Sequence, residues 1–164
     1  MKVKVVKKTN NQLPKYAYEG SAGMDVRADL SLLNLKQIYG SHRAEYKDEV
    51  LESITIYPNT RILIPSGLHI AVPKGYEMQI RPRSGLALKH GITLTNSPAT
   101  IDFGYTGDCG IIIQNTGNAP FELKHGDRIG QFVLKKVEVI EWEEVDSLDD
   151  SDRGEGGFGS SGKA

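Results

Sequence analysis

The stretch RILIPSGLHIAVPKGYEMQIR, residues 61–81, contains three short runs rich in Ile, Leu, Val and Tyr. The turn sequences PSG and PKGY separate these runs, and Gly and Pro favour tight turns there. Similar runs recur along the chain, and they predict strands at 3–7, 26–30, 53–57, 61–64, 68–72, 76–81, 92–95, 110–114, 121–123 and 128–141. Many short strands with frequent turns predict an all-β sandwich, jelly roll or barrel.

Two segments interrupt this pattern. The sequence SGLALKHG at residues 84–91 predicts a short helix, with Ser84 as N-cap and Gly91 just beyond its C-terminus. Residues 34–52 show apolar side chains near helical spacing, but Gly40 interrupts them. We interpret this second segment as a surface insertion that is partly helical.

Composition excludes several classes of protein. The 164 residues fit one domain, and 20 Lys and Arg balance 21 Asp and Glu to a net charge of −1, without the basic excess of a nucleic-acid binder. A single cysteine, Cys109, excludes an internal disulfide and fits a reducing cytoplasm. The N-terminus lacks the apolar core of a signal peptide, and no stretch is long and apolar enough to span a membrane. We expect a cytoplasmic protein without membrane contact, acting in the host cell if its source is viral.

The sequence RPRSGLA, residues 81–87, is a candidate anion site. A helix N-terminus offers unpaired N–H groups, Gly85 allows close approach of a ligand, and Arg83 can bind phosphate in a bidentate way. An ordinary capped helix beside a surface arginine would give the same pattern, so both interpretations remain open here.

The sequence IDFGYTGD, residues 101–108, is a candidate catalytic hairpin. Asp102 follows a strand-like pair and precedes a turn, where a carboxylate can act as general base. Aspartate also begins many turns that have no catalytic role. The glycine-rich end RGEGGFGSSGKA, residues 153–164, is equally ambiguous, since a linker, a frayed end and a closing loop share its composition.

Five segments taken in order resemble a known family. They are SAGMDVRA (21–28), RPRSGLA (81–87), NSPATIDFGYTGD (96–108), HGDRIGQF (125–132) and the glycine-rich end. Together they resemble the five motifs of the trimeric dUTP pyrophosphatase (dUTPase) family over nearly the whole chain. The resemblance implies an all-β, jelly-roll-like antiparallel fold with one short helix, and a homotrimer whose active sites are shared between chains. It also implies hydrolysis of dUTP to dUMP and pyrophosphate with Mg²⁺, which keeps uracil out of DNA and supplies dUMP for dTMP synthesis.

The resemblance assigns roles to individual residues. Asp102 would be the general base that activates the attacking water, and Asp25 would hold Mg²⁺ through coordinated water. Asn96 would bind uracil, and Tyr105 would pack against the deoxyribose. The phosphates would be bound by Arg83, Ser84, Gly85 and Gln131, with Asp127 and Arg128 as structural partners. In the tail, Arg153 would bind the γ-phosphate, Phe158 would stack on uracil, and the terminal phosphate would be contacted by Gly159, Ser160 and Ser161.

The same resemblance divides the chain into a β domain at 1–145 with the insertion at 34–52, an acidic connector at 146–152, and a flexible lid at 153–164. Ala99 and Gly130 depart from the residues that are usual for the family at these positions. Two rival classes remain. A dCTP deaminase shares the fold and a similar second motif but uses a glutamate base and lacks the tail, and a β-sandwich binding module would keep the motifs as structure only.

Overall fold

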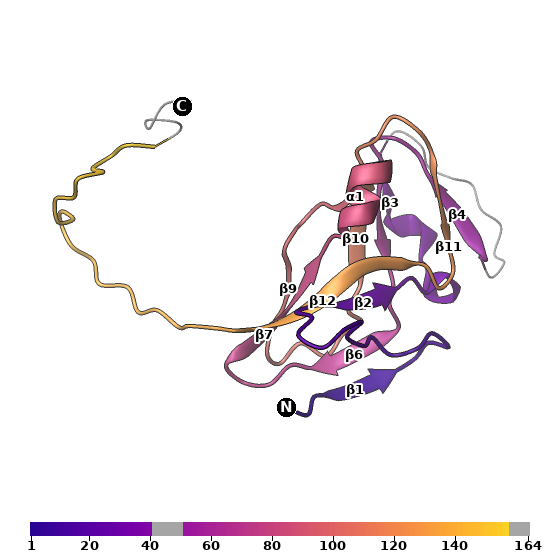
Figure 1. The fold of residues 1–164 in the computed structure, drawn as a ribbon, viewed down its shortest axis with the longest axis horizontal. Helices are drawn as coiled ribbons and strands as arrows, with labels where there is room; N and C mark the ends of the chain where they lie inside the picture. The colour runs from indigo at the N-terminus through magenta and orange to yellow at the C-terminus, as the bar shows by residue number, and fades with distance from the viewer. Residues whose placement is uncertain (41–50, 158–164) are drawn as a thin grey trace.

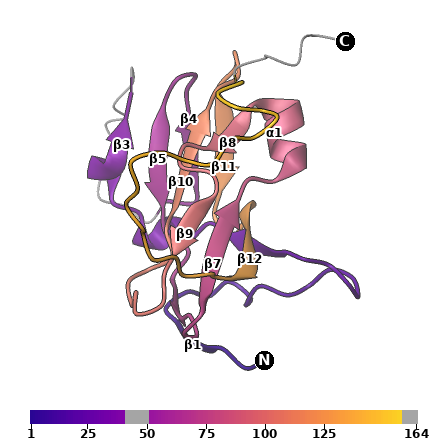
Figure 2. The same ribbon diagram turned by 90° about the vertical axis from the view of Figure 1, so that its left-hand side faces the viewer.

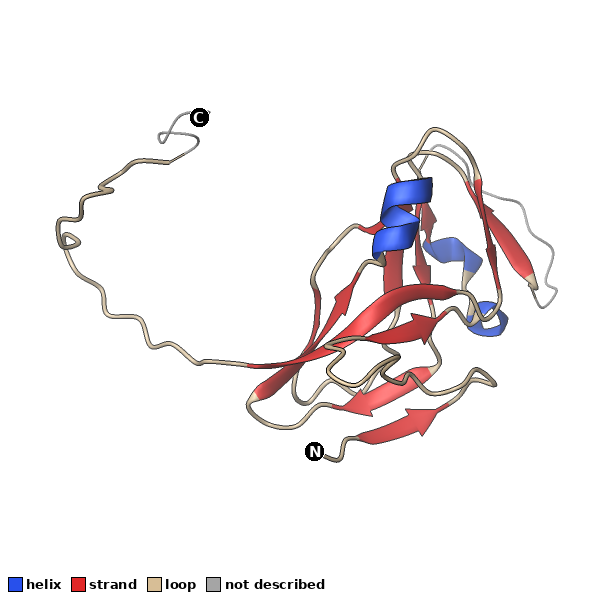
Figure 3. Cartoon of the chain, in the orientation of Figure 1, coloured by secondary structure: helices blue, strands red, loops and turns tan. Residues whose placement is uncertain are grey.

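Antiparallel strands form the body of the protein, with one short helix at one end (Figures 1 and 3). The computed structural model describes residues 1–40 and 51–157. Its helical elements are the 3-10 turns η1 (Leu30–Leu32) and η2 (Leu35–Gln37) and the helix α1 (Ser84–His90). Its strands are β1 (Lys4–Lys7), β2 (Met24–Arg27), β3 (Ile38–Tyr39), β4 (Ser53–Ile56), β5 (Arg61–Ile64), β6 (Leu68–Ala71), β7 (Tyr76–Arg81), β8 (Ile92–Leu94), β9 (Ala99–Ile101), β10 (Ile111–Asn115), β11 (Phe121–Lys124) and β12 (Arg128–Lys136).

The strands form two four-stranded sheets, ordered β3-β5-β10-β8 and β2-β12-β7-β9, and two-stranded pairs β1-β6 and β11-β4. All the pairings between these strands are antiparallel. Strands β10 and β12 contact each other, so the two larger sheets meet around one apolar core (Figure 2). The core is rich in isoleucine, because β-branched side chains pack well on pleated strands. The predicted all-β antiparallel fold with one short helix is confirmed.

Strand β10 shows how alternation fixes the register. Its residues Ile111, Ile113 and Asn115 are fully buried, and those between them are only partly covered. The buried amide of Asn115 donates to the carbonyls of Ile56 and Ala119, both at 2.8 Å, and accepts from the N–H of Gly117 at 2.9 Å. A buried polar group is tolerated when it is hydrogen-bonded in this way. Asn115 therefore ties β10 to the end of β4 and to the following turn.

Several element boundaries differ from those predicted from the sequence. Strand β9 was not among the predicted strands, although the pair before Asp102 was identified as strand-like, and β12 ends at Lys136 instead of 141. Lys136 pairs with Tyr76, where β7 begins, and after it the N–H of Val137 still donates to the carbonyl of Gly75 at 3.0 Å before the chain leaves the sheet. Ser84 is not the N-cap of α1: Arg83 has extended dihedrals, and its carbonyl accepts the first helical hydrogen bond at 3.0 Å. Gly91 ends the helix with a φ of 67°, as predicted.

The segment predicted as a surface insertion at 34–52 begins within the body of the fold. Ile38 is buried, and β3 pairs with β5, so this part extends a sheet. The helical expectation is met only by the short turn η2 in the described part. Residues 41–50 lie outside the described residues.

A C-terminal arm follows β12 and runs away from the strands (Figure 1). Residues 137–155 are exposed along their whole length. The arm also exposes Val139, Ile140 and Trp142, which are 88%, 65% and 90% accessible. None of the helices in residues 1–40 and 51–157 is both long and apolar enough to cross a membrane.

Candidate functional site

Asp25 on β2 lies at the centre of a cluster of polar side chains. Its carboxylate receives Arg128 Nη1 at 2.9 Å and Gln131 Nε2 at 3.1 Å, and it lies 3.3 Å from Arg83 Nε. The side chain of Asp25 is 22% exposed, so a ligand can reach the cluster from solvent. Two guanidinium groups around one carboxylate leave net positive charge, which suits a polyphosphate. The sequence-predicted residues Asp25, Arg83 and Gln131 are thus brought together.

An irregularity in β12 makes this cluster possible. Gln131 pairs with Asp25 and Arg128 pairs with Arg27, but Gly130 pairs with Val26, so Ile129 is an extra residue in the ladder. In a regular strand, residues 128 and 131 would point to opposite faces. The bulge puts both side chains on the face that carries Asp25.

The loop that carries Arg83 adds the second arginine to the cluster. Arg83 Nη1 donates to the carbonyl of Arg128 at 2.9 Å, which fixes the guanidinium between β2 and β12. Ser84 and Gly85 follow it at the start of α1, both exposed, and a Cβ built on Gly85 would meet no atom within 4 Å. This arrangement leaves open space beside the arginine. The carboxylate of Asp127 instead accepts from the N–H of Lys124 at 2.9 Å, in the structural role predicted for it.

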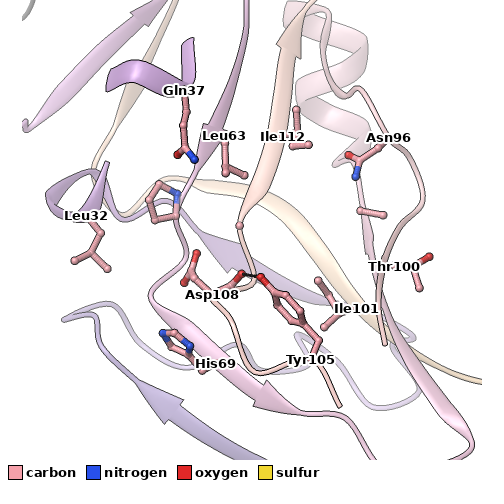
Figure 4. Close-up of a pocket in the computed structure, with 13 residues that line it drawn as sticks. Leu32, Gln37, Leu63, His69, Asn96, Thr100, Ile101, Tyr105, Asp108 and Ile112 are labelled. Carbon is pink, nitrogen blue, oxygen red and sulfur yellow. Dashed lines mark hydrogen bonds between the residues drawn. The ribbon is translucent and has the colours of Figure 1, made fainter. Parts of the chain in front are cut away.

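A second site lies between β9 and the strands β5 and β10 (Figure 4). Asn96, Ile101 and Tyr105 line one side of this pocket, and His69 lines another. The lining combines apolar walls with a few polar groups, as is typical of small-molecule pockets. Two residues predicted to contact a nucleoside, Asn96 and Tyr105, therefore share one pocket.

The turn after β9 carries Asp102 and Tyr105. Asp102 is exposed, and its carbonyl accepts from the N–H of Tyr105 at 3.2 Å. Tyr105 Oη donates to the carbonyl of Asp108 at 3.0 Å. A Cβ built on Gly107 would lie 2.3 Å from Tyr105 Oη and 2.6 Å from its Cζ. The ring of Tyr105 thus lies where the Cβ of any other residue at position 107 would be, so only glycine fits there.

The two sites lie at opposite edges of one sheet. Asp25 is on β2 and Asp102 follows β9, and the strand order is β2-β12-β7-β9. Three inter-strand spacings correspond to roughly 14 Å. The pocket lined by Asn96 and Tyr105 and the one lined by Asp25 and Gln131 share no lining residue. Within one chain, Asp102 and Asp25 therefore cannot act on the same phosphorus atom.

Two buried titratable side chains, Cys109 and Asp29, lie outside both sites. Cys109 is fully buried, and burial raises the pKa of its thiol to about 11, so it is a poor nucleophile. Burial would also raise the pKa of Asp29, but hydrogen bonds from Ser31 and Thr9 outweigh it and hold that pKa below its ordinary value. Among residues 1–40 and 51–157, no three His, Cys, Asp or Glu side chains gather to form a metal cluster.

Among the tail residues with a predicted role, Arg153 is the one that the structure describes, and it lies away from both sites. Arg153 is exposed on the arm, and its Nε donates to the carbonyl of Gly156 at 2.9 Å. Phe158, Gly159, Ser160 and Ser161 lie outside the described residues. Their predicted contacts with substrate stay predictions.

Comparison with known proteins supports the resemblance drawn from the motifs. A sequence model of the dUTPase family matches residues 37–162. The chain belongs to the dUTPase family. The deoxyuridine 5′-triphosphate nucleotidohydrolase of Fusobacterium nucleatum subsp. nucleatum is 47% identical over 163 residues, covering 99% of this chain and 98% of the relative. The protein of the same name from Finegoldia magna is 47% identical over 162 residues, covering 99% of both chains.

Solved dUTPases share the fold. The dUTPase of Staphylococcus bacteriophage 80alpha, solved with dUpNHpp, superposes with a TM-score of 0.78 at 21% identity, covering 99% of both chains. The dUTPase of phage phi11 of S. aureus gives a TM-score of 0.71 at 17% identity, covering 92% of this chain and 100% of the phage chain. The jelly-roll-like fold implied by the motifs is thereby confirmed.

Sequence analysis of this dUTPase family member missed three contacts. Arg128 was predicted to be a structural partner, and its partner is the carboxylate of Asp25, a contact that the motifs did not specify. A glycine inside a predicted strand, Gly130, was the signal for the bulge that turns Arg128 toward Asp25. His69 and Asp108 carried no sequence signal, because their partners Thr106 and Ser66 lie 37 and 42 residues away.

Proposed function

We propose that this protein hydrolyses dUTP to dUMP and pyrophosphate, which keeps uracil out of DNA and supplies dUMP for dTMP synthesis. The observation that most directly supports this function is the 47% identity, over 99% of the chain, to proteins named deoxyuridine 5′-triphosphate nucleotidohydrolase. Two further features support it: an arginine-rich cluster suited to phosphates and a separate pocket suited to a nucleoside.

The phosphate end of dUTP binds at the Asp25 cluster. Arg83 offers a planar fork of donors for phosphate oxygens, with the hydroxyl of Ser84 and the backbone of Gly85 beside it. Gln131 offers a neutral amide, already oriented by its 3.1 Å contact with Asp25. These residues bind and orient the chain of phosphates.

Asp102 acts as general base next to the nucleoside pocket, which its chain neighbour Ile101 lines. Its exposed carboxylate holds a water and takes the proton as the water oxygen bonds to the α-phosphorus. The bond from that phosphorus to the bridging oxygen breaks, and pyrophosphate leaves in line. Asn96 holds the uracil, and the ring of Tyr105 packs on the deoxyribose, so the α-phosphate is placed beside Asp102.

The Asp25 cluster also fits Mg²⁺ bound through water. Mg²⁺ keeps several waters and uses one or two carboxylates together with substrate phosphates, so a single carboxylate is enough. When bound, the ion neutralises charge on the triphosphate. Asp25 would hold it, and Arg128 and Gln131 orient that carboxylate.

The active sites are shared between chains of a homotrimer. The opposite-edge placement of Asp25 and Asp102 supports this, because the two carboxylates can act on the same phosphorus atom only if they come from different chains. The exposed apolar residues of the C-terminal arm support it as well, since Trp142 and Val139 are 90% and 88% accessible and a second chain could cover them. Light scattering tests the assembly: a fully active monomer near 18 kDa would contradict it.

The C-terminal arm carries a lid. We assign 1–145 to the β domain, 146–152 to the acidic connector and 153–164 to the lid. In this assignment Arg153 binds the γ-phosphate, Phe158 stacks on uracil, and Gly159, Ser160 and Ser161 contact the terminal phosphate. The exposure of residues 146–155 supports a connector free to reach another chain.

A nucleotide panel tests the function. The purified protein is incubated with Mg²⁺ and dUTP, UTP, dTTP or dCTP, and release of pyrophosphate and of ammonia is measured. We expect pyrophosphate from dUTP alone. Ammonia from dCTP without pyrophosphate would identify a deaminase, and no turnover together with nucleotide binding would identify a binding module.

Asp102→Asn separates catalysis from binding. The substitution is nearly isosteric at an exposed position, so folding and dUpNHpp binding should be retained. The loss of a general base should lower kcat by about 10²–10⁴-fold. Asp127→Asn is the matched control, since that carboxylate accepts from the backbone N–H of Lys124 and the asparagine keeps an oxygen that can do the same. An unchanged kcat in Asp102→Asn would place the base elsewhere.

A further inference from the structure

The turn that carries Tyr105 is fastened to the start of β6. His69 Nδ1 lies 2.9 Å from the carbonyl of Thr106, within hydrogen-bonding distance. The carboxylate of Asp108 accepts from the N–H of Ser66 at 3.1 Å and from its hydroxyl at 3.3 Å. Each of these bonds joins residues far apart in the sequence, so the turn is held from outside itself.

These contacts hold Tyr105 both through its hydroxyl and through the residue that follows it in the chain. Its hydroxyl donates to the carbonyl of Asp108 at 3.0 Å, so the anchor of Asp108 on Ser66 also anchors the tyrosine. Thr106, the neighbour of Tyr105 in the chain, has its carbonyl 2.9 Å from His69 Nδ1, and Figure 4 shows His69 and Asp108 beside the ring of Tyr105. Neither His69 nor Asp108 belongs to the roles assigned above.

The turn itself has little stiffness of its own. Tyr105 is 46% exposed, and glycines flank it at positions 104 and 107. Gly104 adopts a φ of 89°, a conformation that only glycine reaches readily. Without the hydrogen bonds to His69 and Asp108, the ring of Tyr105 could move aside and admit a sugar that carries a 2′-hydroxyl.

We propose that His69 and Asp108 are positioning residues that set discrimination between deoxyribose and ribose. Steric exclusion of a 2′-hydroxyl works only if the ring of Tyr105 does not move. The side chains of His69 and Asp108 hold that ring in place. The proposal rests on the proposed function, because it takes the sugar of dUTP to pack on Tyr105.

Kinetic discrimination distinguishes positioning from a general structural role. We would measure kcat/KM for dUTP and UTP with the wild type, His69→Ala and Asp108→Ala, and take the ratio of the two values. Loss of one anchoring hydrogen bond should lower this ratio about tenfold. The activity toward dUTP should fall, while that toward UTP is kept or rises.

Conservative variants and a matched control complete the experiment. His69→Asn keeps an N–H donor near the position of Nδ1 and should restore most of the ratio, as should Asp108→Asn, which keeps an acceptor for the Ser66 N–H. His90→Ala removes an exposed histidine on α1 and should leave the ratio unchanged. Asp108→Ala could fail to fold, because Ser66 is buried and would lose its partner. In that case the conservative variants of His69 and Asp108 still test the proposal.

The outcomes separate this inference from the proposed function. No dUTP turnover by the wild type would refute the proposed function and this inference with it. Wild-type turnover of dUTP with an unchanged ratio in His69→Ala would refute the inference alone. Equal losses on both substrates would assign His69 and Asp108 to folding.

Discussion

Gly107→Ala is a direct test of how the turn holds Tyr105. The added methyl group would lie 2.3 Å from Tyr105 Oη and 2.6 Å from Cζ, far inside van der Waals contact. Gly107 does not have a left-handed φ, so alanine causes no backbone strain there. The change therefore acts through one side chain, and the ring of Tyr105 must move.

The size of the effect follows from this geometry. An ordinary carbon–carbon contact begins near 3.5 Å, so the ring has to shift by about 1 Å. The bond from Tyr105 Oη to Asp108 O, now 3.0 Å, would break. Misplacement of a substrate-positioning group by 1 Å can cost about 100-fold in rate. The free energy of unfolding should fall by only about 1 kcal/mol, since the lost hydrogen bond is exposed.

A double-mutant cycle checks the cause. We would measure kcat/KM for dUTP by pyrophosphate release, and stability by urea denaturation, for Gly107→Ala, Tyr105→Ala and the double variant. Tyr105→Ala removes the atoms that clash, so adding Gly107→Ala to it should cost little more. A full further loss of activity in the double variant would refute the reasoning, because the methyl group would then act on something other than Tyr105.

Three other predictions concern the core, the thiol and the arm. Asn115→Ala removes the three hydrogen bonds of a fully buried side chain and should lower the free energy of unfolding by about 2–4 kcal/mol in urea denaturation. Cys109 should react slowly with thiol reagents at pH 8 until the protein unfolds. Because folding raises its pKa from 9.0 to about 11, the unfolded chain loses the proton first, and stability should fall as the pH rises between these values. Deleting residues from Arg153 onward should preserve the circular dichroism spectrum and the melting temperature but abolish most dUTP turnover; full activity would show that the segment is a linker.

Strand content was predictable because its signals are local. Runs such as RILI and LHIA alternate buried and partly exposed residues over four positions, bounded by Pro and Gly. Strand β9 was missed because it has only three residues and lies inside a motif rich in turn formers. The N-cap of α1 was misplaced by one residue, since Arg83 takes the cap position through its backbone without a side-chain hydrogen bond.

By itself, the sequence determined the strand-rich fold, the family and the positions of the motifs, because turns, alternation and short motifs are properties of neighbouring residues. Only the tertiary structure decided which motif residues meet. The bulge at Ile129 turns Arg128 onto the same face as Gln131, and strand order places Asp102 across the sheet from Asp25. The anchoring of Tyr105 by His69 and Asp108 is likewise a tertiary property, since it depends on β6 lying beside a turn that follows it by more than 30 residues.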